Sequence, residues 1–113
     1  MQNTAHAPDA WTTIRALVDW LNRENGASDH ETAMRLMKLT EETGEVMQAY
    51  IGTTGQNPRK GTTHSRADVA DELVDVIVTA AVALHGFTDD PAALFADKLG
   101  RIAARVGVTG GVR

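Results

Sequence analysis

The sequence contains no cysteine, which excludes disulfide bonds, thiolate nucleophiles and zinc sites built on cysteine. Aromatic residues make up only 4% of the chain. Small and branched aliphatic residues take their place, a composition that favours closely packed helices over a sheet. No apolar run is long enough to cross a bilayer, since the longest, residues 76–84, is interrupted by Thr79. No segment has the layout of a signal peptide. We therefore expect a cytoplasmic protein that makes no membrane contact.

Basic residues are also in deficit, and the formal net charge is −4. A nucleic-acid-binding surface needs an excess of basic charge, so we expect no nucleic-acid partner. The 113 residues suffice for one domain with one core. We expect a single domain over residues 1–113, with an ordered core from about residue 9 to 106 and flexible tails at both ends.

Helix-start signals recur along the chain and predict an all-α fold of four helices. Asp9, Ser28, Ser65 and Asp90 can each cap a helix N-terminus, and Ser28 begins the pattern of a capping box. The expected helices cover residues 9–25, 28–51, 65–84 and 90–106. The third is apolar on nearly every side, which predicts a central buried helix.

Two pairs of acidic residues are the most informative feature of the sequence. Glu42 and Glu45 are three apart, as are Glu72 and Asp75, so each pair projects from one face of its helix. Two such helices side by side would form a cage of four carboxylates without nitrogen or sulfur ligands. Oxygen-only cages suit hard cations, so the sequence predicts a site for Mg²⁺, with Mn²⁺ as a substitute.

The neighbours of these carboxylates decide how the pattern is interpreted. Glu42 lies between Leu39 and Val46 on the helix surface, and Glu72 has valines in the same positions. Burying like charges among apolar side chains is unfavourable unless a cation compensates them. The alternative is a solvated acidic face that pairs with basic residues one turn away.

Basic residues that could bind phosphate occur in two other places. The break at residues 52–63 is rich in glycine and threonine and carries Arg59 and Lys60, which suits phosphate binding. The alternative is a mobile linker. In the last helix Lys98 and Arg101 begin a basic stripe that could reach a phosphate, or could simply be a solvated face.

The pattern Glu41-Glu42-x-x-Glu45 followed by Glu72-x-x-Asp75 resembles the signature of the MazG-like nucleoside triphosphate pyrophosphohydrolases. That group belongs to an all-α superfamily with the dimeric dUTPases and the phosphoribosyl-ATP pyrophosphohydrolases. The resemblance extends from about Leu36 to Leu84. It implies a four-helix MazG-like bundle that assembles as a homodimer or a dimer of dimers. The apolar third helix, which the three other helices cannot cover completely, also predicts a homodimer, and we expect Trp11 or Trp20 near the subunit contact. The resemblance also implies Mg²⁺-dependent hydrolysis of a nucleoside triphosphate to the monophosphate and pyrophosphate, in a nucleotide house-cleaning role.

The resemblance also suggests roles for individual residues. The metal ligands would be Glu42, Glu45, Glu72 and Asp75. Glu41 matches an additional acidic position, and Glu41 or Glu45 would accept the proton of the attacking water. The candidates to bind the phosphates are Lys38, Arg59, Lys60, Lys98 and Arg101.

Two other functions are alternatives to this enzyme. A nucleotide-binding or regulatory module could keep the same fold without turnover, although the complete acidic set argues against it. A di-iron bundle requires Glu-x-x-His pairs on its helices, and the sequence has none. The pattern leaves the base and sugar preference open.

Overall fold

The computed structural model describes residues 9–108, which contain four α-helices and no strand. They are α1 (Ala10–Asn25), α2 (Asp29–Thr54), α3 (Arg66–Leu84) and α4 (Pro91–Arg105). The all-α class with four helices is therefore confirmed. None of these helices is long and apolar enough to span a bilayer. The expectations for residues 1–8 and 109–113 lie outside the described range.

The helix ends follow the capping signals, with two differences. α2 continues three residues beyond its expected end at Ile51, to Thr54, where Gly55 adopts a left-handed φ of 66°. The capping box at Ser28 is only half formed: its hydroxyl accepts a hydrogen bond from the Glu31 amide at 3.1 Å. The Glu31 carboxylate does not return to the cap but pairs with Arg35. At Ser65 the box is complete, with Asp68 as its second member.

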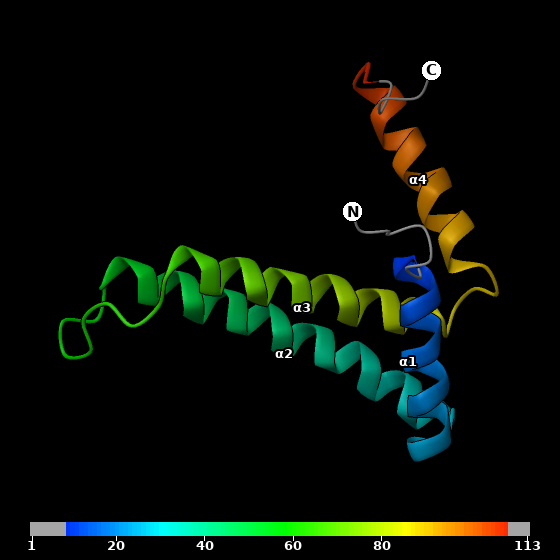
Figure 1. Ribbon diagram of the computed structural model, residues 1–113, viewed down its shortest axis with the longest axis horizontal. Helices are drawn as coiled ribbons and strands as arrows, with labels where there is room; N and C mark the ends of the chain where they lie inside the picture. The colour runs from blue at the N-terminus through cyan, green and yellow to red at the C-terminus, as the bar shows by residue number, and fades with distance from the viewer. Residues whose placement is uncertain (1–8, 109–113) are drawn as a thin grey trace, which may run out of the picture.

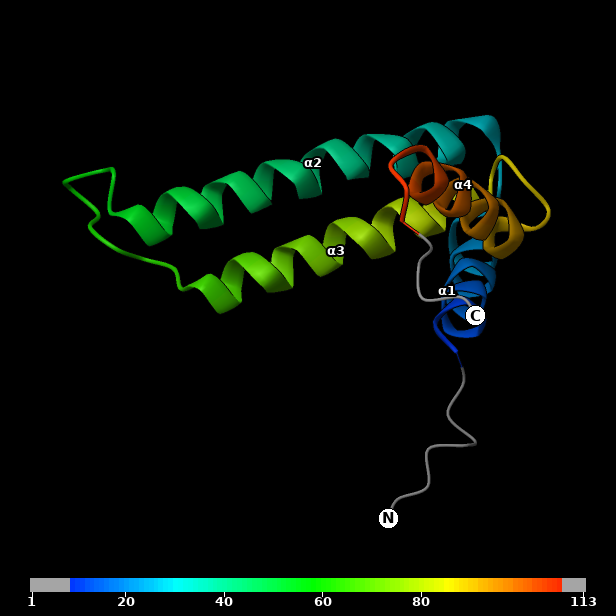
Figure 2. The same cartoon turned by 90° about the horizontal axis from the view of Figure 1, so that it is seen from above.

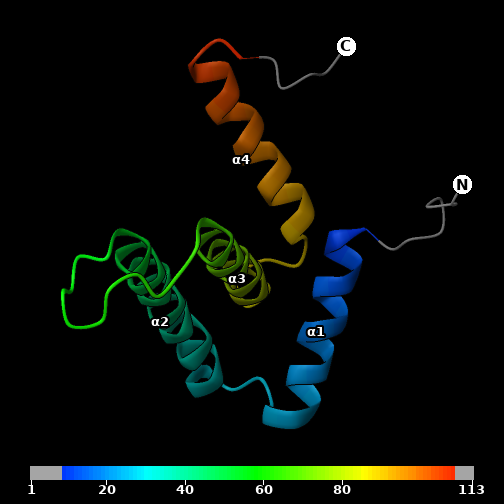
Figure 3. The same ribbon diagram turned by 60° about the vertical axis from the view of Figure 1, so that its left-hand side comes forward.

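The helices α2 and α3 form a long antiparallel hairpin, and α1 lies across the end of it where α3 finishes (Figures 1 and 2). Helix α4 then diverges from the hairpin (Figure 3). The indole of Trp11 links these parts, because its ring centroid lies 6.3 Å from that of His85 and 5.8 Å from that of Phe95 on α4. The four helices do not close into one bundle within a single chain.

The core of the single chain is small. Its buried hydrophobic residues, over the described range, are Val18, Ala49, Ala81 and Ala83. The radius of gyration is 17.7 Å, whereas a compact chain of this length would have about 13 Å. The expectation that α3 is fully buried does not hold within one chain: Ile77 is 65% exposed. Much of α3 stays exposed because only α2 and α1 pack against it extensively.

The far end of the hairpin is closed by a tight contact at Gly52. Its carbonyl accepts hydrogen bonds from the amides of Thr63 at 2.9 Å and His64 at 3.4 Å. A Cβ atom at this position would lie 2.6 Å from the Thr63 hydroxyl and would overlap the His64 ring. The loop therefore packs directly on the backbone of α2, which only glycine permits.

Replacing Gly52 by alanine is expected to lower the free energy of unfolding by about 1–3 kcal/mol, because the loop must move away from α2. Gly100→Ala on α4 is the matched control, since a Cβ there would meet nothing within 4 Å. It should stabilise the protein by up to about 1 kcal/mol through helix propensity. Chemical denaturation of the two variants measures both changes, and shifts of the same sign would contradict the packing at Gly52.

Candidate metal centre and the adjoining pocket

Two stripes of side chains face each other across the α2–α3 hairpin. The stripe on α2 consists of Glu31, Arg35, Lys38, Glu42 and Glu45, and the one on α3 of Glu72, Asp75, Thr79 and Val82. Spacings that alternate between three and four residues keep each stripe on one helix face. The antiparallel pairing brings the two acidic segments together and leaves a pocket beside them.

The carboxylates come together in two groups that share Glu42. In the first group one oxygen each from Glu42, Glu72 and Asp75 lies within 4.8 Å of the others. In the second group Glu41, Glu42 and Glu45 meet the same criterion. Glu42 is only 7% exposed and is the buried charged residue of the described chain. The structure therefore brings all four residues that the sequence suggested as metal ligands to one region, together with Glu41.

Glu72 shows the electrostatic consequence of this arrangement. Burial raises the pKa of its carboxyl above the usual value, and repulsion from Glu45, Asp75 and Glu42 raises it further. Its Oε1 atom is buried and has no hydrogen-bond partner among the described residues. A buried carboxylate oxygen without a donor is uncommon. An oxygen-only donor set with one unsatisfied oxygen fits a hard cation such as Mg²⁺ or Mn²⁺.

Lys38 supplies the cation closest to the cluster. Its Nζ atom lies 3.3 Å from Glu42 and 3.5 Å from Glu41, and these carboxylates raise the pKa of the lysine, Glu42 most strongly. One ammonium group cannot balance five carboxylates, and no ion pair of Glu72 is found in the described range. The position of Lys38 at the edge of the cluster is compatible with a phosphate contact as well as with this pairing.

The other four basic candidates lie away from the cluster. Arg59 and Lys60 are in the loop at the far end of the hairpin, where Lys60 lines a polar cavity of about 320 Å³. Thr54 is the last residue of α2 before this loop, and about 14 Å of helix separates it from Glu45. The loop therefore begins about that far from the carboxylates. Arg101 on α4 pairs with Asp97 at 3.4 Å. Because α4 diverges from the hairpin, the single chain does not bring Lys98 or Arg101 to the carboxylates (Figure 3).

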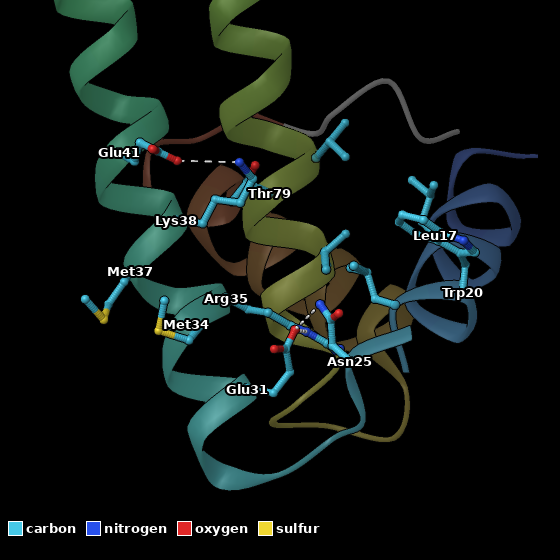
Figure 4. Close-up of a pocket in the computed structure, with 13 residues that line it drawn as sticks. Leu17, Trp20, Asn25, Glu31, Met34, Arg35, Met37, Lys38, Glu41 and Thr79 are labelled. Carbon is cyan, nitrogen blue, oxygen red and sulfur yellow. Dashed lines mark hydrogen bonds and ion pairs between the residues drawn. The ribbon is translucent and has the colours of Figure 1, made fainter. Parts of the chain in front are cut away.

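A pocket of about 700 Å³ adjoins the acidic cluster between α1, α2 and α3 (Figure 4). Lys38 and Glu41 form the end nearest the cluster, and Asn25, Glu31 and Arg35 form the other. The walls are apolar side chains, which include Leu17, Trp20, Met34, Met37 and Val82. The sequence interpretation missed this pocket because Glu31 was assigned to a helix cap. The signal was present, since Glu31 and Arg35 continue the same stripe as Lys38 and Glu42.

Comparison with known proteins finds no protein-family model, no curated protein and no solved structure that matches this chain. A function is therefore inferred from the acidic cluster, from the pocket beside it, and from the resemblance of the two short acidic motifs.

Proposed function

We propose that the protein is a Mg²⁺-dependent nucleoside triphosphate pyrophosphohydrolase, which converts a (d)NTP and water to the (d)NMP and pyrophosphate. One observation carries the proposal: Glu42, Glu72 and Asp75 meet from two helices, and a buried oxygen of Glu72 lacks a partner. Like charges in a poorly solvated place are unfavourable without a cation. The motif resemblance supplies the substrate class, and the adjoining pocket of about 700 Å³ has the size of a small-molecule site.

Each residue of the cluster has a role in this proposal. The residues that would hold the metal are Glu42, Glu45, Glu72 and Asp75. A bound Mg²⁺ would polarise phosphoryl oxygens and offset their charge. Water attacks the α-phosphorus, the bond to the bridging oxygen breaks, and pyrophosphate leaves. Glu41 or Glu45 accepts the proton of the water, because neither belongs to the group that Glu42 forms with Glu72 and Asp75. Lys38 offsets the charge that grows on the phosphates.

A screen of canonical and oxidised nucleotides for pyrophosphate release tests the reaction. The expected result is equal amounts of monophosphate and pyrophosphate from at least one nucleotide, with no turnover in excess chelator. Release of orthophosphate alone would contradict the proposal. Calorimetric binding of a nucleotide without turnover would favour the non-catalytic binding module instead.

We further propose that a second copy of the chain completes a MazG-like bundle, as a homodimer or a dimer of dimers. The observation is the large apolar surface that one chain leaves open. It includes Leu36, Met47 and Tyr50 on α2, Leu73, Val74 and Ile77 on α3, and Leu94, Phe95, Leu99 and Ile102 on α4. Apolar surface of this extent marks an interface, and an isologous pair is the commonest way to cover it.

In such an assembly the basic residues that lie away from the cluster of their own chain would also have a function. Lys98 and Arg101 of one chain would approach the carboxylates of its partner, and Arg59 and Lys60 would bind phosphate from the loop. Trp20, which is half exposed, would lie near the subunit contact, whereas Trp11 is engaged within its own chain. The proposal keeps the cytoplasm as the site of this nucleotide house-cleaning activity, with no nucleic-acid partner.

Ile77→Glu is expected to convert the assembly to a monomer, because a charge replaces an apolar side chain at the centre of the open face of α3. Val108→Glu is the control: this side chain is also exposed, but it lies beyond the end of α4 at Arg105 and not on α3. Light scattering at micromolar concentration measures the mass of each variant. A wild-type mass of one chain, 12.1 kDa, would contradict the assembly outright.

A further inference from the structure

The polar end of the pocket consists of three side chains joined by hydrogen bonds, those of Asn25, Glu31 and Arg35. Arg35 donates from Nε to Glu31 Oε2 at 2.9 Å, and Asn25 donates from Nδ2 to the same oxygen at 3.2 Å. Arg35 also donates to the carbonyl of Gly26 at 3.2 Å, which fixes the guanidinium group against the turn between α1 and α2. The side chains of Arg35 and Glu31 are only 15% and 16% exposed. Glu31 is therefore held in one orientation inside a mainly apolar pocket.

The two oxygens of this carboxylate are not equivalent. Oε2 accepts both hydrogen bonds, whereas Oε1 accepts none from the residues that the structure describes. Arg35 and then Asn25 lower the pKa of Glu31, so the group stays ionised near neutral pH. An ionised carboxylate only accepts hydrogen bonds. Any ligand group that meets Oε1 in the pocket must therefore be a donor.

The distance between the two ends of the pocket matches the proposed substrate. Glu31 and Glu41 are ten residues apart on α2, which corresponds to about 15 Å along the helix axis. An extended nucleoside triphosphate spans a similar length. With its phosphates at Lys38 and the acidic cluster, its base would reach the end formed by Glu31, Arg35 and Asn25 (Figure 4).

We infer that this pocket binds the base of the substrate and that Glu31 selects bases with an amino group on the hydrogen-bonding edge, namely guanine, adenine or cytosine. The inference rests on the proposed function and names the substrate class of the same site. The exocyclic amine donates to Glu31 Oε1. Uracil and thymine offer this oxygen only the ring N3–H, which is flanked on both sides by carbonyl oxygens that the carboxylate repels. The apolar walls, with Trp20 from α1 and Met34 from α2, contact the faces of the ring.

The test uses nucleotide analogues with a methylene bridge between the α- and β-phosphorus, which bind without turnover. Calorimetry with Mg²⁺ present should show that the wild type binds the guanine, adenine or cytosine analogue at least about tenfold more tightly than the uracil analogue. Glu31→Gln should reduce this preference to about threefold or less, because an amide can offer a donor as well as an acceptor. The preference of Glu24→Gln should match the wild type, since Glu24 does not line the pocket.

A second variant tests whether the base binds in this pocket, independently of the turn that Arg35 secures. Trp20→Ala removes a half-exposed side chain and should weaken all four analogues by about tenfold without changing their order. Turnover with the same base preference in the wild type and in Glu31→Gln would overturn the inference and leave the proposed function intact. Failure of every nucleotide to bind or turn over would overturn both.

Discussion

Glu42→Gln is expected to reduce kcat/KM for pyrophosphate release by at least about a hundredfold, while circular dichroism shows the helices unchanged. Glu42 belongs to both carboxylate groups, so this one amide removes a ligand from each. The side chain is almost fully buried. Its removal also frees Lys38 from the closer of its two ion pairs.

The matched control for this variant is Asp71→Asn. Asp71 neighbours Glu72 in sequence and carries the same charge, but it is exposed and belongs to neither carboxylate group. If loss of one negative charge were enough to impair activity, both variants would be slow. Activity of Glu42→Gln within a few-fold of the wild type would show that the cluster is an ordinary acidic surface.

The second large effect concerns stability without metal. Because the pKa of Glu72 is higher in the folded chain than its ordinary value of 4.5, the folded state binds more protons than the unfolded state just above that pH. The metal-free protein should therefore lose stability as pH rises from 4.5 through the raised pKa, and the loss should then level off. Glu72→Gln removes this loss, so its melting temperature at neutral pH should exceed that of the wild type.

Other carboxyl groups titrate in the opposite sense and do not obscure this effect. The pKa values of Asp9, Glu31 and Asp68 are lowered by their hydrogen bonds. These groups stabilise the folded state at pH values above the ordinary carboxyl pKa, and this stabilisation is lost as pH falls through their lowered pKa values. The difference between the wild type and Glu72→Gln cancels these groups at every pH.

Mg²⁺ should reverse the order of the two proteins at neutral pH. A cation that binds only the folded state stabilises it by about 2.7 kcal/mol at a concentration one hundred times its dissociation constant. Glu72→Gln lacks one ligand and should gain much less. Melting curves at pH 4 and pH 7.5, each with Mg²⁺ and with chelator, measure all of these effects. A wild type whose melting temperature at pH 7.5 is the same with Mg²⁺ and with chelator would contradict a metal centre.

Local signals predicted most of the secondary structure. Helix starts depend on a side chain that reaches an amide three residues away, so Asp9 and Ser65 identify theirs directly. The juxtaposition of the carboxylates could also be anticipated, because helix periodicity fixes which side chains share a face. For Gly52 the sequence suggested only a loop; that the loop closes on the backbone of α2 depends on side chains eleven and twelve residues away.

The features of the structure that the sequence did not predict have a common physical origin. Composition shows that α3 is apolar, but not whether the covering surface belongs to the same chain. The direction of α4 depends on the turn after His85 and on the packing of Trp11 against Phe95, which no periodicity encodes. The pocket was missed because Glu31 has two possible partners, the cap amides and Arg35. Only the three-dimensional arrangement shows that Arg35 is preferred.

The hairpin of α2 and α3 has a consequence for the order of folding. The two acidic pairs come from consecutive helices of one chain, with Glu42 and Glu72 thirty residues apart, so bringing them together is an intramolecular loop closure. A partner chain is met only by diffusion, at a rate that depends on concentration. In the proposed assembly the carboxylate cluster would therefore form in a unimolecular step, before a second copy covers the apolar faces of α3 and α4. Dilution would then slow assembly but not the formation of the cluster.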